Sequence, residues 1–423
     1  MLKRFIRKLI PPLLIGWYHF CLALIAAIAY RFPSRQLTVI GVTGTNGKST
    51  TVAMASQILE QAGYKVAYLS SIKFKIGGKE IINDLRMTMP GRFTVQRFFR
   101  QAVNSGCRYA LLEVTSEGIK QYRDRFISFK TAIFTNLSPE HIEAHGGFEN
   151  YREAKVSFFR RVKGVHIVNL DDANAKFFLE VPAAKKIGYT MENRTGTEPV
   201  VSASKTEGPD LTFIVNGRVF KLNLKGEFNI SNALAAISLG LSEGIGLDTC
   251  RIGLEKISGM PGRMEEVISM PFKVFVDYAF TPNALKKVYQ ALRPQTKNLV
   301  CVLGSCGGGR DKWKRPVLGS LAAKYCDKVI ITNEDPYDED PQEIIDQVAK
   351  GVGSKAEKIV DRKLAINSAI KNAQDNDLIV ITGKGCEPSI CLKNGERIPW
   401  DDRQVVREAF KERNSLDKRE LKA

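Results

Sequence analysis

Short apolar segments of strand length alternate with helix-length stretches along most of this 423-residue chain. Parallel strands need crossover connections, so buried strands separated by helices favour a parallel sheet. The sequence therefore predicts an α/β protein with a parallel sheet in each half. The predicted strands are residues 37–42, 110–114, 131–135 and 166–169 in the first half, and 273–276, 299–303, 328–332 and 378–382 in the second.

The two series are separated by Gly259-Met-Pro-Gly-Arg263, and we place a domain boundary near Ser258. Three parts are predicted: an apolar N-terminal helix in residues 1–36, a central domain over 37–258, and a Rossmann-like C-terminal domain over 259–423. Two alternating runs in residues 210–224 flank Asn216-Gly217, a pair that favours a tight hairpin. The charged tail from Lys411 is expected to be frayed.

Composition narrows the functional class. Apolar residues make up 44% and charged residues 26%, which excludes a disordered, collagen-like or polytopic membrane protein. The formal net charge of +18 favours acidic partners such as nucleotides or phosphorylated substrates. Nucleic acid is not expected, because no basic stretch is interleaved with aromatic residues. The cysteines form no Cys-x-x-Cys pair, and we expect reduced thiols in a cytoplasmic protein.

The apolar segment 13–30 admits two interpretations, which spacing alone does not separate. Lys3, Arg4, Arg7 and Lys8 precede it, and Arg31 and Arg35 follow it. Basic residues on both sides disfavour a membrane span, because one flank would have to cross the bilayer. The segment is either a helix packed on the protein's own core or a basic-flanked helix lying in the membrane interface. The second interpretation would bring the protein to the inner face of the membrane.

A glycine-rich loop follows the first predicted strand and opens the helix predicted over 49–62. Its sequence is Gly41-Val-Thr-Gly-Thr-Asn-Gly-Lys-Ser-Thr50, with Val42 where the strict pattern has its first glycine. Such loops hold phosphate with backbone N–H groups, and Lys48 and Ser49 are placed to reach phosphate and Mg²⁺. The alternative is a turn that only caps a helix. The predicted nucleotide-binding residues are Gly44, Thr45, Asn46, Gly47, Lys48, Ser49 and Thr50.

Three further side chains can carry chemistry. Glu113 ends a predicted strand, where ligands bind at the carboxyl edge of a parallel sheet. His141 follows the strand 131–135, and Lys155 lies in the helical pattern 151–159. Each has a plain structural alternative: Glu113 a capping partner, His141 a loop hydrogen-bonder, and Lys155 a solvated residue near Glu153.

At this point the sequence resembles the ATP-dependent Mur ligases, and within them the tripeptide-synthetase branch. The resemblance covers roughly residues 37–412. The motifs that carry it, in order, are Gly44–Thr50, Glu113-Val-Thr-Ser116, Thr135-Asn-Leu-Ser-Pro-Glu-His141, Tyr151-x3-Lys155, Gly226-Glu-Phe-Asn-Ile-Ser-Asn232, Gly262-Arg-Met-Glu265, Val276-Asp-Tyr-Ala-Phe-Thr-Pro282, Arg310-Asp-Lys-x-Lys-Arg-Pro316 and Gly383-Lys-Gly-Cys-Glu387.

The resemblance implies an ADP-forming ligase that joins a muramoyl-peptide carboxylate to an amino acid through an acyl phosphate, in peptidoglycan synthesis. It implies ATP and two Mg²⁺ ions, one held by Ser49 and Glu113 and the other by His141 and Lys155. Lys155 would be carbamylated, which turns a cationic amine into an oxygen ligand for metal. The implied catalytic residues are Lys48, Glu113, His141 and Lys155.

The same matching implies binding residues. Asn229 and Asn232 would lie near adenine, Asp277 near the ribose and Arg263 near the phosphates. The last two come from beyond Ser258, so ATP would sit between two domains. The implied substrate-binding residues are Thr88, Thr115 and Arg123 for the muramoyl peptide, and Glu334, Asp335, Tyr337 and Glu387 for the amino acid.

Some positions depart from the family pattern. Only 36 residues precede Leu37, fewer than the family's uridine-binding domain needs, so a lipid-linked muramoyl carrier is conceivable. Tyr337 stands where diaminopimelate-adding enzymes carry arginine, and Phe280 and Cys386 replace histidines. The added amino acid stays open, and we expect a monomer. The alternatives are a folylpolyglutamate or poly-γ-glutamate synthase, or a membrane-attached ATP-binding module without ligase activity.

Overall fold

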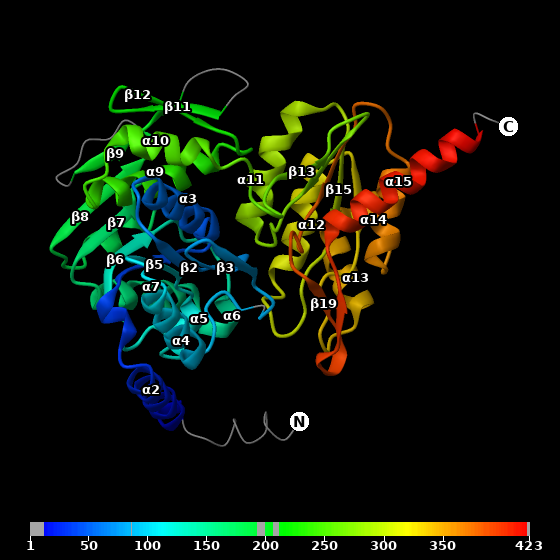
Figure 1. Cartoon of the computed structure of the whole chain (residues 1–423). Helices are drawn as coiled ribbons and strands as arrows, with labels where there is room; N and C mark the ends of the chain where they lie inside the picture. The colour runs from blue at the N-terminus through cyan, green and yellow to red at the C-terminus, as the bar shows by residue number, and fades with distance from the viewer. Residues whose placement is uncertain (1–11, 86, 193–198, 206–210, 421–423) are drawn as a thin grey trace. The chain divides into compact units, whose positions relative to one another are not determined.

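A computed structural model describes residues 12–85, 87–192, 199–205 and 211–420 (Figure 1). The chain forms two compact units. The first contains the described residues up to Ser138, with Phe148–Asn223 and Asn229–Ile257. The second contains Pro139–Gly147, Leu224–Phe228 and the chain from Ser258 onward.

The helices are more numerous than the sequence patterns indicated. The α-helices of the first unit are α2 (Pro12–Ala29), α3 (Lys48–Gln61), α4 (Arg92–Asn104), α5 (Ser116–Lys120), α7 (Phe148–Arg161), α8 (Ala175–Leu179), α9 (Phe228–Ser242) and α10 (Leu247–Glu255). Those of the second are α6 (Ile142–His145), α11 (Pro282–Leu292), α12 (Lys314–Tyr325), α13 (Pro341–Val352), α14 (Arg362–Lys371) and α15 (Asp402–Glu420). Short 3-10 turns are η1 (Pro33–Gln36), η2 (Arg293–Gln295), η3 (Gly353–Lys355) and η4 (Lys393–Gly395).

The first unit is built on a nine-stranded sheet with the order β4-β3-β2-β5-β1-β6-β7-β8-β9. The seven strands in the run β2-β5-β1-β6-β7-β8-β9 pair in parallel. Strands β3 and β4 continue the sheet beyond β2 as an antiparallel edge. The strands are β1 (Thr38–Thr43), β2 (Val66–Leu69), β3 (Lys73–Ile76), β4 (Lys79–Ile82), β5 (Tyr109–Glu113), β6 (Phe129–Phe134), β7 (Val165–Asn169), β8 (Lys185–Thr190) and β9 (Val200–Ser202).

Helices cover both faces of this sheet, so its central strands read as continuous apolar runs rather than alternating ones. On one face, side chains of α4, α7 and α8 such as Phe99, Phe159 and Phe178 pack on Leu112 and Phe134. Helices α3 and α10 pack together, and α3 lies against β1, β2 and β5. The carboxyl ends of β2, β5, β1 and β6 therefore open side by side at one edge.

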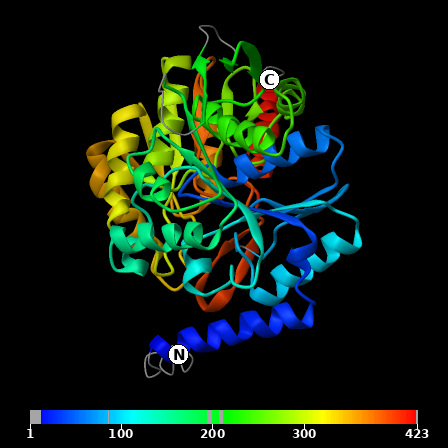
Figure 2. The same ribbon diagram turned by 90° about the vertical axis from the view of Figure 1, so that its left-hand side faces the viewer.

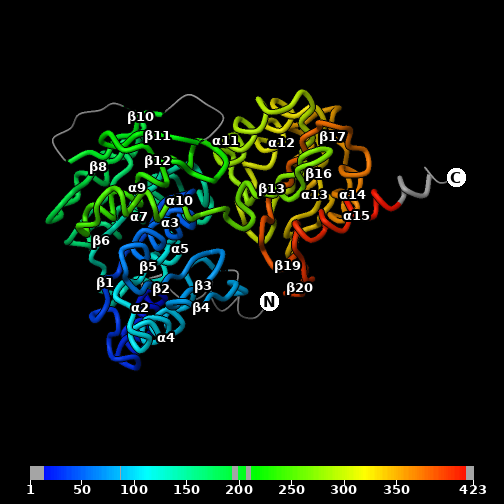
Figure 3. The backbone as a smooth tube through the Cα atoms, turned by 45° about the horizontal axis from the view of Figure 1, so that its top comes forward, coloured from blue at the N-terminus to red at the C-terminus, as the bar shows by residue number. Residues whose placement is uncertain are grey.

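The first unit also contains a small three-stranded sheet with the order β10-β11-β12 (Figure 3). It comprises β10 (Ser204–Lys205), β11 (Leu211–Val215) and β12 (Arg218–Leu222). Asn216 and Gly217 have φ angles of 46° and 74°, as a type I′ turn requires. The predicted hairpin is confirmed; residue 210, at its predicted start, lies outside the described residues.

The second unit contains a six-stranded sheet with the order β13-β14-β18-β15-β16-β17, in which only β13 pairs antiparallel. Alternate residues of β14 face opposite layers: Phe275 packs with α11, α12 and α13, and Val274 packs with α14 and α15. The strands are β13 (Glu265–Ile268), β14 (Lys273–Val276), β15 (Leu299–Leu303), β16 (Lys328–Ile331), β17 (Ala356–Lys358) and β18 (Leu378–Ile381), and a separate hairpin is formed by β19 (Ser389–Cys391) and β20 (Arg397–Pro399).

The predicted α/β class is confirmed. The tail beyond Lys411 is helical as far as Glu420, because it continues α15. The face of this helix that carries Val406 and Ala409 is buried against the second sheet. At the other end of the chain, α2 begins at Pro12, and the four basic residues that precede it in the sequence lie outside the described residues. None of the described helices has both the length and the hydropathy required to cross a membrane.

Candidate active site

The glycine-rich loop connects β1 to α3 in a conformation that needs glycine at two positions. Gly44 and Gly47 have φ angles of 149° and 85°. A Cβ atom at Gly44 would lie 1.9 Å from Thr135 Oγ1, and one at Gly47 would lie 2.3 Å from Asn232 Oδ1. Neither distance is compatible with a side chain, so these glycines allow the neighbouring strands and α9 to approach the loop.

Asn136, at the carboxyl end of β6, holds this loop from the side. Its side-chain Oδ1 accepts the Asn46 N–H at 3.0 Å, and its Nδ2 donates to Asn46 O at 3.0 Å. Its backbone carbonyl accepts the Thr45 N–H at 2.8 Å. The motif that contains Asn136 was recognised in the sequence, but this anchoring role was not, because it depends on the adjacency of β1 and β6.

Substitution of Asn136 by alanine is expected to raise the KM for ATP about tenfold with little change in kcat, because two side-chain hydrogen bonds to the loop are lost. Steady-state kinetics with varied ATP measure this split. Asn104→Ala, at the exposed end of α4, is the matched control and is expected to leave both parameters unchanged. An unchanged KM in the Asn136 variant would contradict an anchoring role.

Two lysines meet at one carbonyl oxygen of the loop. Lys48 Nζ donates to Gly44 O and to Thr45 O, both at 3.0 Å, and Lys155 Nζ donates to Gly44 O at 2.9 Å. The distance between the two Nζ atoms therefore cannot exceed the sum of their hydrogen-bond distances to Gly44 O. Burial and the charge of Lys48 hold the pKa of Lys155 well below its usual range.

Lys155 extends from α7 into the interior and is only 2% exposed. Its ammonium position lies 4.8 Å from the ring centre of Tyr151, whose hydroxyl is 3.0 Å from Thr45 Oγ1. Among the described residues it has no carboxylate partner. Glu153 instead pairs with Arg160 on the exposed side of the helix, so the alternative of a solvated Lys155 beside Glu153 is wrong.

Glu113 ends β5 and is completely buried. Its Oε1 accepts the Ser71 N–H at 2.7 Å, and its Oε2 accepts the Ser71 hydroxyl at 3.1 Å. Ser71 Oγ also lies 2.9 Å from Thr88 Oγ1. A chain of polar contacts thus links the proposed metal ligand Glu113 to the proposed substrate loop at Thr88. Ser71 was missed because nothing in its sequence neighbourhood marks the end of β2.

The other candidates of the first unit each have a defined contact or position. Asn229 Oδ1 accepts Asn232 Nδ2–H at 3.0 Å, and Asn232 approaches the loop at Gly47. Thr115 caps α5 by accepting the Gly118 N–H at 3.0 Å. Arg123 donates to the Met89 carbonyl, which directly follows Thr88, and burial lowers its pKa. Ser49 and Thr50 are buried in the first turn of α3.

His141 belongs to the second unit, whereas Lys48, Glu113 and Lys155 belong to the first. It stands at the start of α6 with a φ of 56°. The N–H groups of Ile142 and Glu143 each donate to the Asp311 carboxylate at 3.1 Å. Asp311 therefore satisfies the first turn of this short helix and fixes the backbone that carries His141. The described residues contain no group of three His, Cys, Asp or Glu side chains suited to hold a metal.

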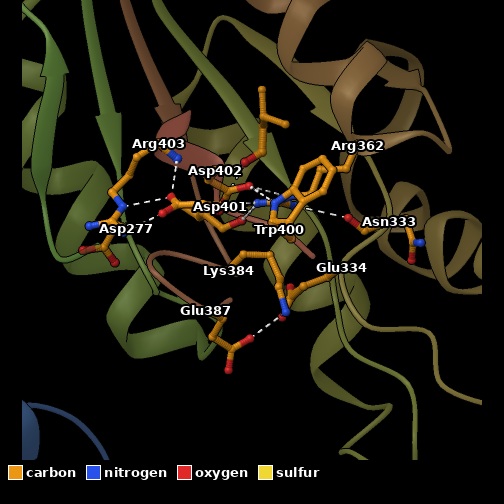
Figure 4. Close-up of polar contacts among 12 residues, drawn as sticks. Asp277, Asn333, Glu334, Arg362, Lys384, Glu387, Trp400, Asp401, Asp402 and Arg403 are labelled. Carbon is orange, nitrogen blue, oxygen red and sulfur yellow. Dashed lines mark hydrogen bonds and ion pairs between the residues drawn. The ribbon is translucent and has the colours of Figure 1, made fainter. Parts of the chain in front are cut away.

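A buried ionic cluster lies at the carboxyl ends of the strands of the second unit (Figure 4). Lys384 Nζ donates to both oxygens of Asp335 at 2.9 Å and to Glu387 Oε2 at 2.6 Å. The Tyr278 hydroxyl donates to Glu387 Oε1 at 2.8 Å. Lys384 was not singled out from the sequence, although it stands inside the quoted motif that ends at Glu387. Its ammonium group is buried between two carboxylates only because the folded chain brings these segments together, and no local sequence pattern indicates this.

Glu334 and Tyr337 are the other two residues predicted to bind the amino acid. The Cys306 thiol donates to Glu334 Oε1 at 2.8 Å, while burial raises the pKa of Glu334. Glu334 Oε2 is buried without a hydrogen-bond partner among the described residues. Tyr337 has a φ of 52°, and its ring lies against Gly308. The site thus contains carboxylates, one ammonium group and a phenol at the predicted amino-acid position.

Two neighbouring groups support the cluster. Asp277 accepts the Met264 and Ala279 N–H groups at 2.7 and 2.6 Å, and burial raises its pKa, opposed by Arg263. Arg362 and Asp402 form a buried bidentate pair at 2.8 and 2.7 Å (Figure 4). The guanidinium group also donates to the carbonyls of Asn333 and Thr382, the residues that lead from β16 and β18 into the site.

Comparison with known proteins identifies the family. Residues 42–240 match the Mur ligase middle domain, and residues 262–385 match the Mur ligase glutamate ligase domain. The UDP-N-acetylmuramyl-tripeptide synthetase of Roseiflexus sp. is 34% identical over 431 residues, covering 95% of this chain and 84% of the relative. The chain belongs to the Mur ligase family. The predicted family and the prediction of a ligase are confirmed.

This Mur ligase is also similar to other ligases of known sequence or structure. A UDP-N-acetylmuramoyl-L-alanyl-D-glutamate--2,6-diaminopimelate ligase of Clostridium botulinum is 36% identical, over 92% of this chain and 81% of its own. A solved diaminopimelate ligase superposes with a TM-score of 0.59 at 29% identity, covering 89% of this chain and 79% of that one. Mycobacterium tuberculosis folylpolyglutamate synthase reaches a TM-score of 0.70 at 19% identity, over 86% and 92% of the chains, which shows a shared fold.

Proposed function

We propose that this Mur ligase forms an amide bond between a muramoyl-peptide carboxylate and an amino acid, with hydrolysis of ATP to ADP, in peptidoglycan synthesis. The observation that carries the proposal is the meeting of Lys48 and Lys155 on the carbonyl of Gly44, inside a phosphate loop of a Mur ligase chain. A carboxylate and ATP are both anionic, so their reaction requires cationic groups at the transferring phosphoryl group. Lys48 and the loop N–H groups supply part of that charge.

The first unit fits magnesium as well as phosphate. Mg²⁺ prefers oxygen ligands, and the Ser49 hydroxyl and Glu113 carboxylate lie in the segments that frame the loop edge. The bound ion would neutralise phosphate charge. Ser71 orients the Glu113 carboxylate through two hydrogen bonds. We assign a second ion to His141 and to Lys155 in its carbamylated form.

The environment of Lys155 supports its proposed carbamylation. A buried ammonium group on Lys155 that shares one carbonyl with the half-buried Lys48, and that has no carboxylate partner among the described residues, would be strongly unfavourable. A neutral amine avoids this cost, and a neutral amine is also the form that reacts with CO₂. The resulting carbamate is anionic, so it would be attracted to Lys48 and able to bind metal through oxygen.

We assign the central part of the chain, 37–258, to ATP and the muramoyl peptide, and the C-terminal part, 259–423, to the amino acid and further contacts with ATP. Asn229 and Asn232 are the proposed adenine contacts, Asp277 the ribose contact and Arg263 a phosphate contact. Thr88, Thr115 and Arg123 are assigned to the muramoyl peptide. Because the reaction consumes ATP, the proposed location is the cytoplasm, and the proposed state is a monomer.

The amino acid is assigned to Glu334, Asp335, Tyr337 and Glu387. Tyr337 offers a phenol, which cannot form the bidentate fork that arginine makes with a distal carboxylate. We therefore propose an amino acid without such a distal carboxylate. The acidic surroundings of Lys384 favour a substrate whose side chain is not anionic.

Tyr337→Arg is expected to shift preference toward diaminopimelate, raising its kcat/KM relative to lysine about tenfold to a hundredfold through a charge-assisted fork. Tyr337→Lys is the matched control, since it adds charge without the fork and should give a smaller shift. Competition between the two amino acids, read by mass spectrometry of the product, measures the ratio. A wild-type enzyme that already prefers diaminopimelate would contradict the assignment.

The function itself is tested by phosphate release from ATP over a panel of muramoyl peptides and amino acids, with mass spectrometry of the products. We expect release only when both co-substrates are present, together with a product whose mass corresponds to one new amide. The proposal would be overturned if phosphate release did not depend on either co-substrate. It would also be overturned if no phosphate were released with any UDP-linked or lipid-linked muramoyl peptide.

A further inference from the structure

Helix α2 has two chemically similar faces with different surroundings. On one face, Ala23, Ala26 and Ala27 are buried, and the helix packs against α4 (Figure 2). On the same side Phe20 makes ring contacts with Tyr122 and Phe126 at centroid distances of 6.1 and 5.1 Å. Small residues allow close packing here. The helix is therefore a fixed part of the first unit.

The opposite face of α2 is apolar and exposed. At 100° per residue its large side chains fall into a single stripe about a third of the circumference wide. The helix contains no charged residue, and its polar groups on this face are limited to the Tyr18 hydroxyl and the Cys21 thiol. The exposed stripe, with exposed fractions of 53–61%, comprises Leu14, Trp17, Tyr18, Ile25 and Ile28.

The segments that contain α2 and α4 carry basic residues and no acidic ones. The sequence contains no Asp or Glu before Glu60 and none between Asp84 and Glu113, which are the stretches that hold α2 and α4. Arg31 and Arg35 follow the helix and are exposed, and Arg97 is exposed on α4. Apolar side chains ringed by basic residues are complementary to an anionic lipid surface.

We propose that the exposed stripe of α2 docks the protein on the surface of an anionic lipid bilayer. Trp17 and Tyr18 have the amphipathic rings that favour the headgroup region, and the aliphatic side chains would enter the acyl boundary. A second copy of the chain is a poorer occupant, because it would bring the exposed arginines beside the stripe, Arg31, Arg35 and Arg97, together with those of its partner.

The docked helix would orient the first unit on the membrane rather than tether it loosely. The Arg100 guanidinium group of α4 donates to the carbonyl of Tyr30 at 3.1 and 2.8 Å, directly after the last turn of α2. This contact and the buried alanine face fix the helix to the globular unit. The proposal is independent of the ligase assignment, since no stripe residue belongs to the proposed active site.

Co-sedimentation of the full chain with vesicles tests the proposal. We expect binding to vesicles of equal parts phosphatidylglycerol and phosphatidylcholine, and much weaker binding to pure phosphatidylcholine. Binding should weaken at high salt, because screening reduces the attraction of exposed charges. The double variant Trp17→Gln/Ile25→Gln is expected to lose about a hundredfold in partitioning, since two exposed apolar side chains are removed.

The matched control is Leu364→Gln, which replaces a residue of similar exposure on α14 and should bind vesicles as the wild type does. Circular dichroism and ligase turnover with water-soluble substrates, both expected to be unchanged, establish that the double variant is folded. Equal binding to both vesicle types, or full binding by the double variant, would overturn the proposal. So would a dimer by light scattering that the double variant converts to a monomer, because it would assign the stripe to a second copy.

Discussion

Replacement of Lys155 by alanine is expected to lower kcat for amide formation by at least about a thousandfold, comparable to the loss of a central electrostatic contact in other enzymes. The reason is the position of Lys155, buried and 2.9 Å from the phosphate-loop carbonyl of Gly44. If its carbamate holds metal, the variant loses both the ligand and its charge. Initial rates of product formation at saturating substrates measure the effect.

Chemical rescue distinguishes the charge state in which Lys155 acts. The Lys155→Ala cavity should accept acetate, which restores a carboxylate, and activity should rise with its concentration. Methylamine, which restores a cation, should not rescue. Rescue by methylamine alone would contradict a carbamate. Lys163→Ala, which removes an exposed lysine just beyond α7, should retain near-normal turnover and serves as the control.

Replacement of Lys384 by methionine is expected to destabilise the second unit by about 3–5 kcal/mol and to abolish saturable binding of the amino acid. Lys384 is completely buried and is the ammonium partner of both Asp335 and Glu387. Without it, two carboxylates would remain at a site with little solvent. Denaturant unfolding, followed by a probe confined to the second unit, gives the free energy change.

Two variants make this result specific. Lys358→Met removes an exposed partner of Asp346 and should cost no more than about 1 kcal/mol. Adding Asp335→Asn and Glu387→Gln to Lys384→Met should recover most of the lost stability, because the unpaired charges are then gone. If the single variant unfolds like the wild type, the cluster is not the buried ion network that the structure describes.

The sequence predicted best those elements whose conformation depends on a single short segment. The strands and the glycine-rich loop follow from local patterns, and the turn at Asn216-Gly217 follows from two residues. Short or exposed strands such as β3 and β4 were missed because Lys73–Ile76 and Lys79–Ile82 bury little apolar surface. The extent of α15 was missed because its charged surface hides the few apolar residues, such as Val406, that face the sheet.

The site depended on contacts between distant segments. Glu113 and Lys155 were proposed from motifs, but Ser71, Asn136 and Lys384 were not, since their roles arise from strand adjacency and burial. The contact partner of the His141 segment was likewise not predicted from the sequence. His141 lies in the second unit beside Asp311, a contact across 169 residues of sequence between Ile142 and Asp311 that no local pattern announces.

The proposed function depends on Lys155 acting as a carbamate at the phosphate loop, which we propose and which no contact in the structure establishes by itself. Carbon-13 NMR of the protein equilibrated with ¹³C-bicarbonate tests it most directly. We predict one carbamate signal that disappears, together with ligase activity, when CO₂ is removed, that is absent in Lys155→Ala and that persists in Lys163→Ala. Full ligase activity in a protein that shows no carbamate signal would contradict a carbamylated Lys155.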